Sequence, residues 1–269
     1  VTDVIVIALE MLLSMIVVLY FAIKIQIKKI FALFLYIYHT FFSIFYAIFS
    51  LSNPADSRSY YLNSLNIDKD FSLGSNMVVY FSHFFTNFLE LSYLGLFMVF
   101  NLIGLLGILF VYAAFQKALK YNSKFYKYAT ILFIFLPTLH FWSSAPGKDS
   151  VAMLATGLFI YSASLNFKQY KIIVLSLFLM LLVRPHIYLV MQLSIFFVLL
   201  NNLSTVKKFL FTMLFFMGSY FMLEIVLRYV GIELFQYQVL IDYITHREGE
   251  NTQGGSSFNL SETPLYFRP

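Results

Sequence analysis

Three short clusters of polar residues interrupt an otherwise apolar sequence, and their residue types suit chemistry on a sugar and a phosphate. The first cluster, residues 53–61, holds Asp56 and Arg58 directly after an apolar stretch. A carboxylate can take a proton from a sugar hydroxyl, and an arginine can bind phosphate through charge-assisted hydrogen bonds. Because Asn-Pro and Asp also favour turns, an ordinary solvated turn explains these residues equally well.

The second cluster, residues 140–150, contains the only tryptophan of the chain. His140 and Trp142 suit the positioning of sugars, and Lys148 with Asp149 combines a cation with a proton acceptor. Each has an ordinary alternative, because Asp149 can cap the next helix, Lys148 can extend its amine to the membrane surface and Trp142 can anchor at the interface. Their density between two short apolar stretches favours the functional interpretation.

The third cluster is Arg184-Pro185-His186. An arginine beside a bilayer costs free energy unless it faces water or a partner, so Arg184 is a functional candidate. The alternative is an interfacial arginine that reaches lipid headgroups. Pro185 suits the first turn of a following helix.

The second and third clusters share a physical logic. Helices that begin near Ser150 and Ile187 expose unpaired N–H groups, which attract anions. With Lys148, Arg184 and, within reach, Arg58, they predict a cationic pocket for an anion such as a lipid-linked diphosphate.

The elements that must position these clusters are apolar stretches of helical length, since about 20 helical residues cross a bilayer core. The expected spans are residues 4–23, 30–51, 93–115, 128–142, 150–166, 172–183, 187–202 and 209–227, with outer loops at 52–92 and 228–269. The sequence therefore predicts one all-α, polytopic transmembrane helical bundle of about eight spans, a single membrane domain over residues 1–269.

Charge predicts the orientation of the bundle. Eleven of the 18 Lys and Arg residues lie in alternate loops without acidic residues: Lys24, Lys28, Lys29, Lys117, Lys120, Lys124, Lys127, Lys168, Lys171, Lys207 and Lys208. Short loops rich in Lys and Arg stay in the cytoplasm. The N-terminus and the three clusters are therefore expected outside the plasma membrane.

Two expected helical hairpins, 128–166 and 172–202, contain helices too short to cross comfortably. Twelve residues at 1.5 Å rise cover about 18 Å, against a core of about 30 Å. Irregular backbone at membrane depth survives only beside protein or a water-filled cavity. Both hairpins turn on the outer side, so we expect a polar cavity at the outer face.

The first outer loop shows helical periodicity. Its apolar face consists of Met77, Tyr80, Phe81, Phe84, Phe85 and Phe88, and its polar face of Ser82, His83, Thr86, Asn87 and Glu90. This pattern predicts a helix lying flat at the membrane interface, where it would roof the cavity. Polar residues inside the spans are expected to be interhelical hydrogen-bond partners; they are Glu10, His39, Asn101, Gln192 and Glu224.

The amino-acid composition is that of a membrane protein. Hydrophobic residues make up 60% of the chain and charged residues 12%, whereas soluble domains are about one quarter charged. The net charge of +5 is spread over loops beside apolar stretches, so membrane lipids are the expected partner and nucleic acid is not. Cysteine is absent, which removes thiolate chemistry. Because the sequence begins at Val1 and stops at Pro269, we expect a piece of a longer protein.

The chain resembles bacterial membrane proteins of surface-polysaccharide gene clusters, especially oligosaccharide repeat-unit (O-antigen) polymerases. The resemblance rests on Phe141-Trp142-Ser143-Ser144 with Lys148-Asp149-Ser150, on Arg184-Pro185-His186, and on Gly254-Gly255-Ser256 with Phe267-Arg268-Pro269. It implies joining of polyprenyl-diphosphate-linked oligosaccharides on the outer face of the bacterial plasma (inner) membrane. It also implies contact with other polysaccharide-assembly membrane proteins.

On this interpretation Arg58, Lys148 and Arg184 hold the diphosphate, and Asp56 or Asp149 is the general base. Asp56 is favoured, because Asp149 is the better helix cap. Sugars are positioned by His140, Trp142 and His186. The scheme needs no metal or cofactor, since fixed cations offset the charge of the leaving group.

Two rival functions fit the same features. A multi-span transferase that adds single sugars from a polyprenyl-phosphate donor also suits an outer-loop acid. A flippase for lipid-linked glycans suits broken helices and a cavity. A transporter that works by alternating access, however, is expected to interrupt its helices near the middle of the membrane. The helix interruptions predicted here lie toward the outer face, which argues against a flippase.

Overall fold

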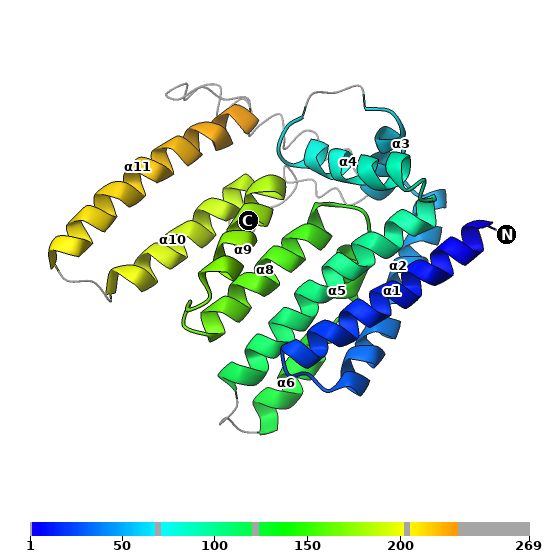
Figure 1. Ribbon diagram of the computed structural model, residues 1–269, viewed down its shortest axis with the longest axis horizontal. Helices are drawn as coiled ribbons and strands as arrows, with labels where there is room; N and C mark the ends of the chain where they lie inside the picture. The colour runs from blue at the N-terminus through cyan, green and yellow to red at the C-terminus, as the bar shows by residue number, and fades with distance from the viewer. Residues whose placement is uncertain (1, 68–70, 120–123, 202–204, 231–269) are drawn as a thin grey trace, which may run out of the picture. The chain divides into compact units, whose positions relative to one another are not determined.

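The computed structural model describes residues 2–67, 71–119, 124–201 and 205–230, and every regular element in these ranges is a helix. In chain order they are α1 (Thr2–Lys24), α2 (Lys29–Ser52), α3 (Asp56–Leu65), α4 (Ser75–His83), the π-helical turn η1 (Phe84–Phe88), α5 (Tyr93–Ala118), α6 (Lys124–Ile134), α7 (Pro137–Ser143), α8 (Lys148–Ser164), α9 (Tyr170–Val183), α10 (Pro185–Asn201) and α11 (Thr205–Val230) (Figure 1). The all-α prediction is confirmed for these ranges. The glycines at 254–255 and the Phe-Arg-Pro at 267–269 lie outside the described residues.

The contacts divide the chain into two compact units, Val1–Ile195 and Phe196–Pro269. The first unit contains all three polar clusters. In the second, Phe196 in the second half of α10 stacks on Phe215 of α11 with ring centroids 4.1 Å apart.

Three of the described helices, α1, α2 and α5, are long and apolar enough to cross a membrane. They coincide within a few residues with the expected spans 4–23, 30–51 and 93–115. Shorter apolar helices occur at α9 and in most of α10. The remaining expected crossings stay predictions.

The predicted single helix over 128–142 is wrong, because the chain breaks there into α6 and α7. Pro137 occupies the start of α7, and Leu136 before it adopts an extended conformation with ψ of 122°. Proline lacks the N–H that would continue the helical ladder, and it disfavours helical geometry in the preceding residue. The break turns α7 toward α2, against which it packs.

Helix α5 is the centre of the first unit and packs against α1, α2 and, most extensively, α8. Two glycines allow the closest approach. A Cβ atom on Gly157 of α8 would lie 2.9 Å from the carbonyl carbon of Gly107 on α5, and one on Gly107 would lie 2.6 Å from the backbone nitrogen of Leu154. Backbones that touch through glycine pack tightly in membrane proteins. This contact fixes α8, whose first turn carries Lys148 and Asp149.

The loop 52–92 is largely helical, as predicted for its second half. The polar face of α4 and η1 packs onto the end of α3, where the carbonyl oxygen of Ser64 accepts from Asn87 Nδ2 at 2.8 Å and Thr86 Oγ1 at 3.1 Å. Phe84 and Phe88 remain exposed. The backbone N–H of Gly74 donates to the carbonyl of Leu182 at 2.7 Å, which ties this layer to the end of α9.

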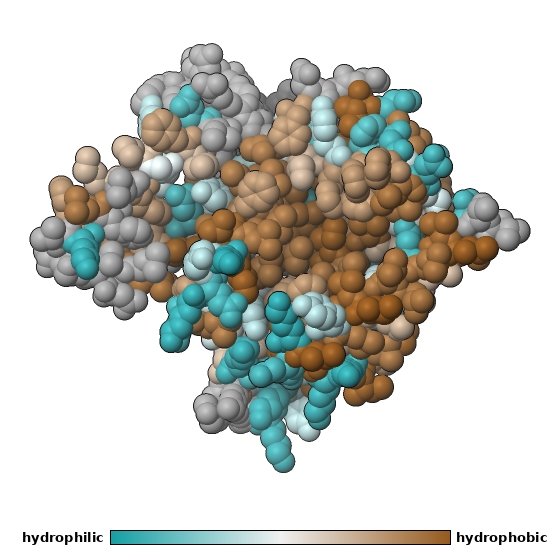
Figure 2. Space-filling view, in the orientation of Figure 1, coloured by the Kyte–Doolittle hydropathy of each residue, from teal (hydrophilic) through white to brown (hydrophobic). Residues whose placement is uncertain are grey.

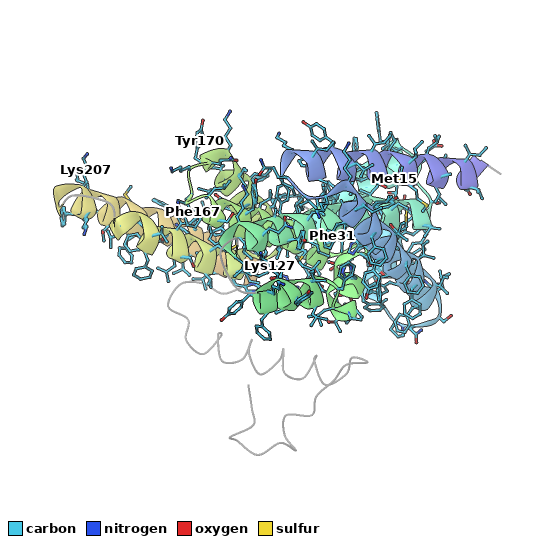
Figure 3. All side chains as sticks on the ribbon, turned by 90° about the horizontal axis from the view of Figure 1, so that it is seen from below. Met15, Phe31, Lys127, Phe167, Tyr170 and Lys207 are labelled. Atoms are coloured by element: carbon cyan, nitrogen blue, oxygen red, sulfur yellow. The ribbon has the colours of Figure 1, made fainter. Side chains whose placement is uncertain are left out.

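Hydrophilic residues of the first unit gather at two edges. Figure 2 shows them at the lower edge, where α1, α5 and α8 end and α6 begins, and around α3 and α4 at the upper edge, with hydrophobic residues between. Figure 3 shows the side chains of the same elements from below, with Lys127, Phe167 and Tyr170 among the labelled residues. The described parts of the first three lysine-rich segments, at the ends of α1, α5 and α8 and the start of α6, therefore share one edge, opposite the polar clusters.

Candidate functional site

The second and third polar clusters meet at an ion pair between Asp149 and Arg184. Asp149 lies in the first turn of α8, and Arg184 directly follows α9. The two helices pack side by side, with the Ser176 hydroxyl donating to the Ala155 carbonyl at 2.8 Å. Arg184 Nη2 donates to Asp149 Oδ1, and the two side chains are 32% and 46% exposed. The pair is thus accessible to a ligand.

The alternative role of Asp149 as the cap of α8 is not observed. Gly147 occupies the N-cap position, and the Asp149 carboxylate turns to Arg184 instead. Ser150 Oγ donates back to the Gly147 carbonyl at 2.9 Å. Because Asp149 is not used as a helix cap, it is as good a candidate for the general base as Asp56.

A pocket of about 490 Å³ borders the ion pair. Its polar lining includes Asp149, Arg184, Thr138, Ser143 and Thr156, and its apolar lining includes Leu136, Leu139, Trp142, Met153, Met180 and Ile187. Its volume lies within the usual range of ligand pockets, about 300–1,000 Å³. Three predicted site residues, Trp142, Asp149 and Arg184, therefore line one pocket.

Lys148 lies next to Asp149 in sequence, but its amine faces α4. Lys148 Nζ donates to Ser75 Oγ at 3.1 Å, and Tyr60 Oη donates to the same oxygen at 3.4 Å. Lys148 does not line the pocket. It joins the second cluster to the helices of the outer loop.

The first cluster lies beside this site and not in the pocket lining. Asp56 is exposed in the first turn of α3, and Arg58 is exposed with Nη1 donating to the Leu51 carbonyl at 3.2 Å. Tyr60 of the first cluster and Lys148 of the second meet at Ser75 Oγ, and Tyr46 of α2 packs against Phe141 of the second cluster. The buried ring of Tyr46 stacks on Phe141 with centroids 4.3 Å apart.

Sequence reasoning missed Tyr46, which lies in the last two turns of α2. It also missed Ser75. Nothing in their residue types separates them from the many other tyrosines and serines of the chain.

His140 is not placed to contact a sugar. It is fully buried, and its Nδ1 lies 2.8 Å from Nδ1 of His39 on α2. Its Nε2 donates to the carbonyl of Ile134 at 2.7 Å. His140 therefore joins α7 to α2, and His39 is an interhelical partner as predicted. Asn101 is another, donating to Thr40 Oγ1 at 3.0 Å.

His186 is exposed in the first turn of α10 and does not line the pocket, although its neighbour Ile187 does. The amides of Ile187 and Tyr188 donate to the carbonyl of Arg184 at 3.0 and 3.1 Å, which fixes the turn between α9 and α10. This turn holds the Arg184 side chain at the pocket.

Comparisons with models of known protein families, with curated proteins and with solved structures found no match. The function therefore rests on the chemistry of the site.

Proposed function

We propose that this chain is part of a membrane glycosyltransferase that joins polyprenyl-diphosphate-linked oligosaccharides on the outer face of the bacterial plasma membrane, in surface-polysaccharide synthesis. The observation that supports it best is the Asp149–Arg184 pair, which brings a proton acceptor and a phosphate-binding cation to one pocket. The lysine-rich segments lie at one edge, and such segments stay in the cytoplasm. Their position at the edge opposite the polar clusters supports an outward orientation of the clusters.

In the proposed reaction an acceptor hydroxyl attacks the anomeric carbon of the donor sugar. A new C–O bond forms as the C–O bond to the diphosphate breaks, and its electron pair leaves with the diphosphate. Asp149 takes the hydroxyl proton as general base. Arg184 stabilises the negative charge that grows on the leaving group.

The ion pair gives this reaction an order of events. Before substrate binds, Arg184 neutralises Asp149. An arriving diphosphate competes for the guanidinium, because phosphate oxygens match its planar donors. As Arg184 turns to the diphosphate, the Asp149 carboxylate is freed to accept a proton. Lys148, one residue away, adds positive potential.

The rest of the pocket suits a lipid-linked sugar. Trp142 is 55% exposed and offers an indole face to a sugar ring. Met153, Met180 and Ile187 provide an apolar wall for an isoprenoid. Asp56 and Arg58 lie outside the lining, so in this proposal they bind the acceptor beside the pocket.

The test is made in the full-length gene. Arg184→Ala and Asp149→Asn are expected to abolish long surface polysaccharide on a gel, with the protein present at wild-type level. Lys171→Ala is the matched control, because Lys171 is an exposed cation at the opposite end of the same helix, α9. Wild-type ladders from both site variants would overturn the assignment.

The products separate the rival functions. Addition of one sugar without a ladder would identify a single-sugar transferase. In liposomes, movement of a lipid-linked oligosaccharide without a new glycosidic bond would identify a flippase.

A further inference from the structure

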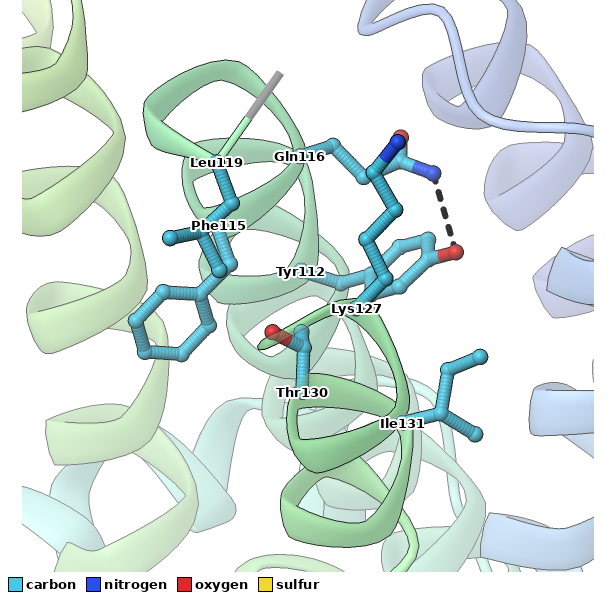
Figure 4. Close-up of a pocket in the computed structure, with 7 residues that line it drawn as sticks. All are labelled: Tyr112, Phe115, Gln116, Leu119, Lys127, Thr130 and Ile131. Atoms are coloured by element: carbon cyan, nitrogen blue, oxygen red, sulfur yellow. Dashed lines mark hydrogen bonds between the residues drawn. The ribbon is translucent and has the colours of Figure 1, made fainter. Parts of the chain in front are cut away.

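A second pocket lies at the lysine-rich edge of the first unit, between the last turns of α5 and the middle of α6 (Figure 4). Its volume is about 440 Å³. Its polar lining consists of Tyr112, Gln116, Lys127 and Thr130, and its apolar lining of Phe115, Leu119 and Ile131. It shares no lining residue with the pocket at Asp149.

The polar side is arranged to donate hydrogen bonds. Gln116 Nε2 donates to Tyr112 Oη at 2.9 Å, which leaves the tyrosine proton and the second amide hydrogen of Gln116 for a ligand. Figure 4 shows Lys127 extending toward both side chains, with Phe115 and Leu119 on the opposite side. Among the described residues Lys127 forms no ion pair. The pocket therefore presents a cation and neutral donors, which together suit a phosphate.

The surroundings of the pocket are apolar. Helix α5 has the length and composition of a membrane span, and it ends at Ala118 beside the pocket. On α6, Phe125 and Leu132 are each 72% exposed. Tyr126 and Tyr128 on the same helix are 52% and 64% exposed, and exposed tyrosines beside a lysine-rich edge are typical of the membrane interface. Lipids would therefore surround the mouth of this pocket.

The charge of the lipid headgroup determines which lipid this pocket can bind. A zwitterionic headgroup brings its own cation, which Lys127 would repel, whereas an anionic headgroup is complementary to an uncompensated amine. A soluble phosphate would satisfy the polar side but would leave the apolar side of the pocket without a partner.

We propose that this pocket binds one anionic phospholipid. Its phosphate contacts Lys127, Gln116 and Tyr112, and the upper part of an acyl chain lies along Phe115 and Leu119 on the opposite side. The proposal does not depend on glycosyl transfer, because it uses none of the residues of the other pocket.

The experiment uses the full chain purified in a mild detergent with equal amounts of phosphatidylglycerol and phosphatidylcholine, and counts bound lipids by native mass spectrometry. Wild-type protein is expected to retain phosphatidylglycerol preferentially. Lys127→Gln is expected to lower the retained phosphatidylglycerol about fivefold, the effect of one basic contact near a membrane surface. Lys124→Gln is the control, because Lys124 is exposed on the same helix outside the lining. It is expected to change retention less than about twofold.

Three results would overturn the proposal. The first is wild-type protein without a preference between the two lipids. The second is an equal loss in both variants, which would indicate diffuse attraction to the lysine-rich edge. The third is displacement of phosphatidylglycerol by inorganic phosphate, which would indicate a simple anion site.

Discussion

The contact between Gly107 and Gly157 gives the sharpest test of the packing that positions the site. In Gly157→Ala the new Cβ would lie 2.9 Å from both the carbonyl carbon and the Cα atom of Gly107, whereas ordinary contacts begin near 3.4 Å. Both obstacles are backbone, so no side chain can turn away. Helix α8 would have to move away from α5, and among the described helices no other pair packs together as extensively as these two.

The expected magnitude follows from two opposing effects. Overpacking of this kind costs about 3 kcal/mol, at the upper end of the usual range because backbone must shift. Alanine is a better helix former than glycine and returns about 1 kcal/mol. The net loss in the free energy of unfolding is therefore about 2 kcal/mol.

Gly218→Ala is the matched control. A Cβ atom on Gly218 of α11 meets nothing within 4 Å, so only helix propensity acts, and this variant is expected to gain about 1 kcal/mol. The assay follows helical circular dichroism during unfolding by added denaturing detergent, with each variant compared with wild type. Equal stability of the two variants would refute the close contact between α5 and α8.

Three further outcomes are expected. His140→Leu should lower the free energy of unfolding by about 2 kcal/mol, because it leaves His39 Nδ1 buried and unpaired. Replacing both histidines by leucine should lower it by less. The same unfolding assay compares the two variants, and equal losses would contradict the pairing. Asp149→Asn should lower stability by less than about 1 kcal/mol because its ion pair is partly exposed, so a thermal unfolding midpoint close to wild type would show that lost product reflects lost chemistry. Because the chain has no cysteine, Ser59→Cys and Gln169→Cys can be labelled singly in intact cells. A membrane-impermeant maleimide should label Ser59→Cys and not Gln169→Cys, and the reverse pattern would contradict the orientation.

The long helices could be predicted because length and apolar composition determine them locally. Residues 4–23, 30–51 and 93–115 match α1, α2 and α5 closely for this reason. The break at Leu136 also had a local signal in Pro137, but the continuous apolar pattern around it favoured one helix. Helix α3 was missed because Asn53-Pro54 marks a turn, and the helix begins only two residues later.

The partners of the charged side chains could not be predicted, because they depend on packing between distant segments. Asp149 and Arg184 are 35 residues apart, and Lys148 and Ser75 are 73 apart. Asp149 suits a helix cap and an ion pair equally well by residue type. Only the packing of α8 against α9, with Arg184 at the end of α9, decides between them. His140 likewise became a packing residue because α7 turns its ring toward His39.

The central claim is that the pocket at Asp149 and Arg184 joins lipid-linked sugars, and a purified reaction tests it most directly. The full-length protein in liposomes would be supplied with a polyprenyl-diphosphate-linked oligosaccharide, and its products would be separated by size. We expect a ladder from wild-type protein and unreacted substrate from Arg184→Ala. Unreacted substrate from both, with the wild-type protein folded and the substrate bound, would contradict the account.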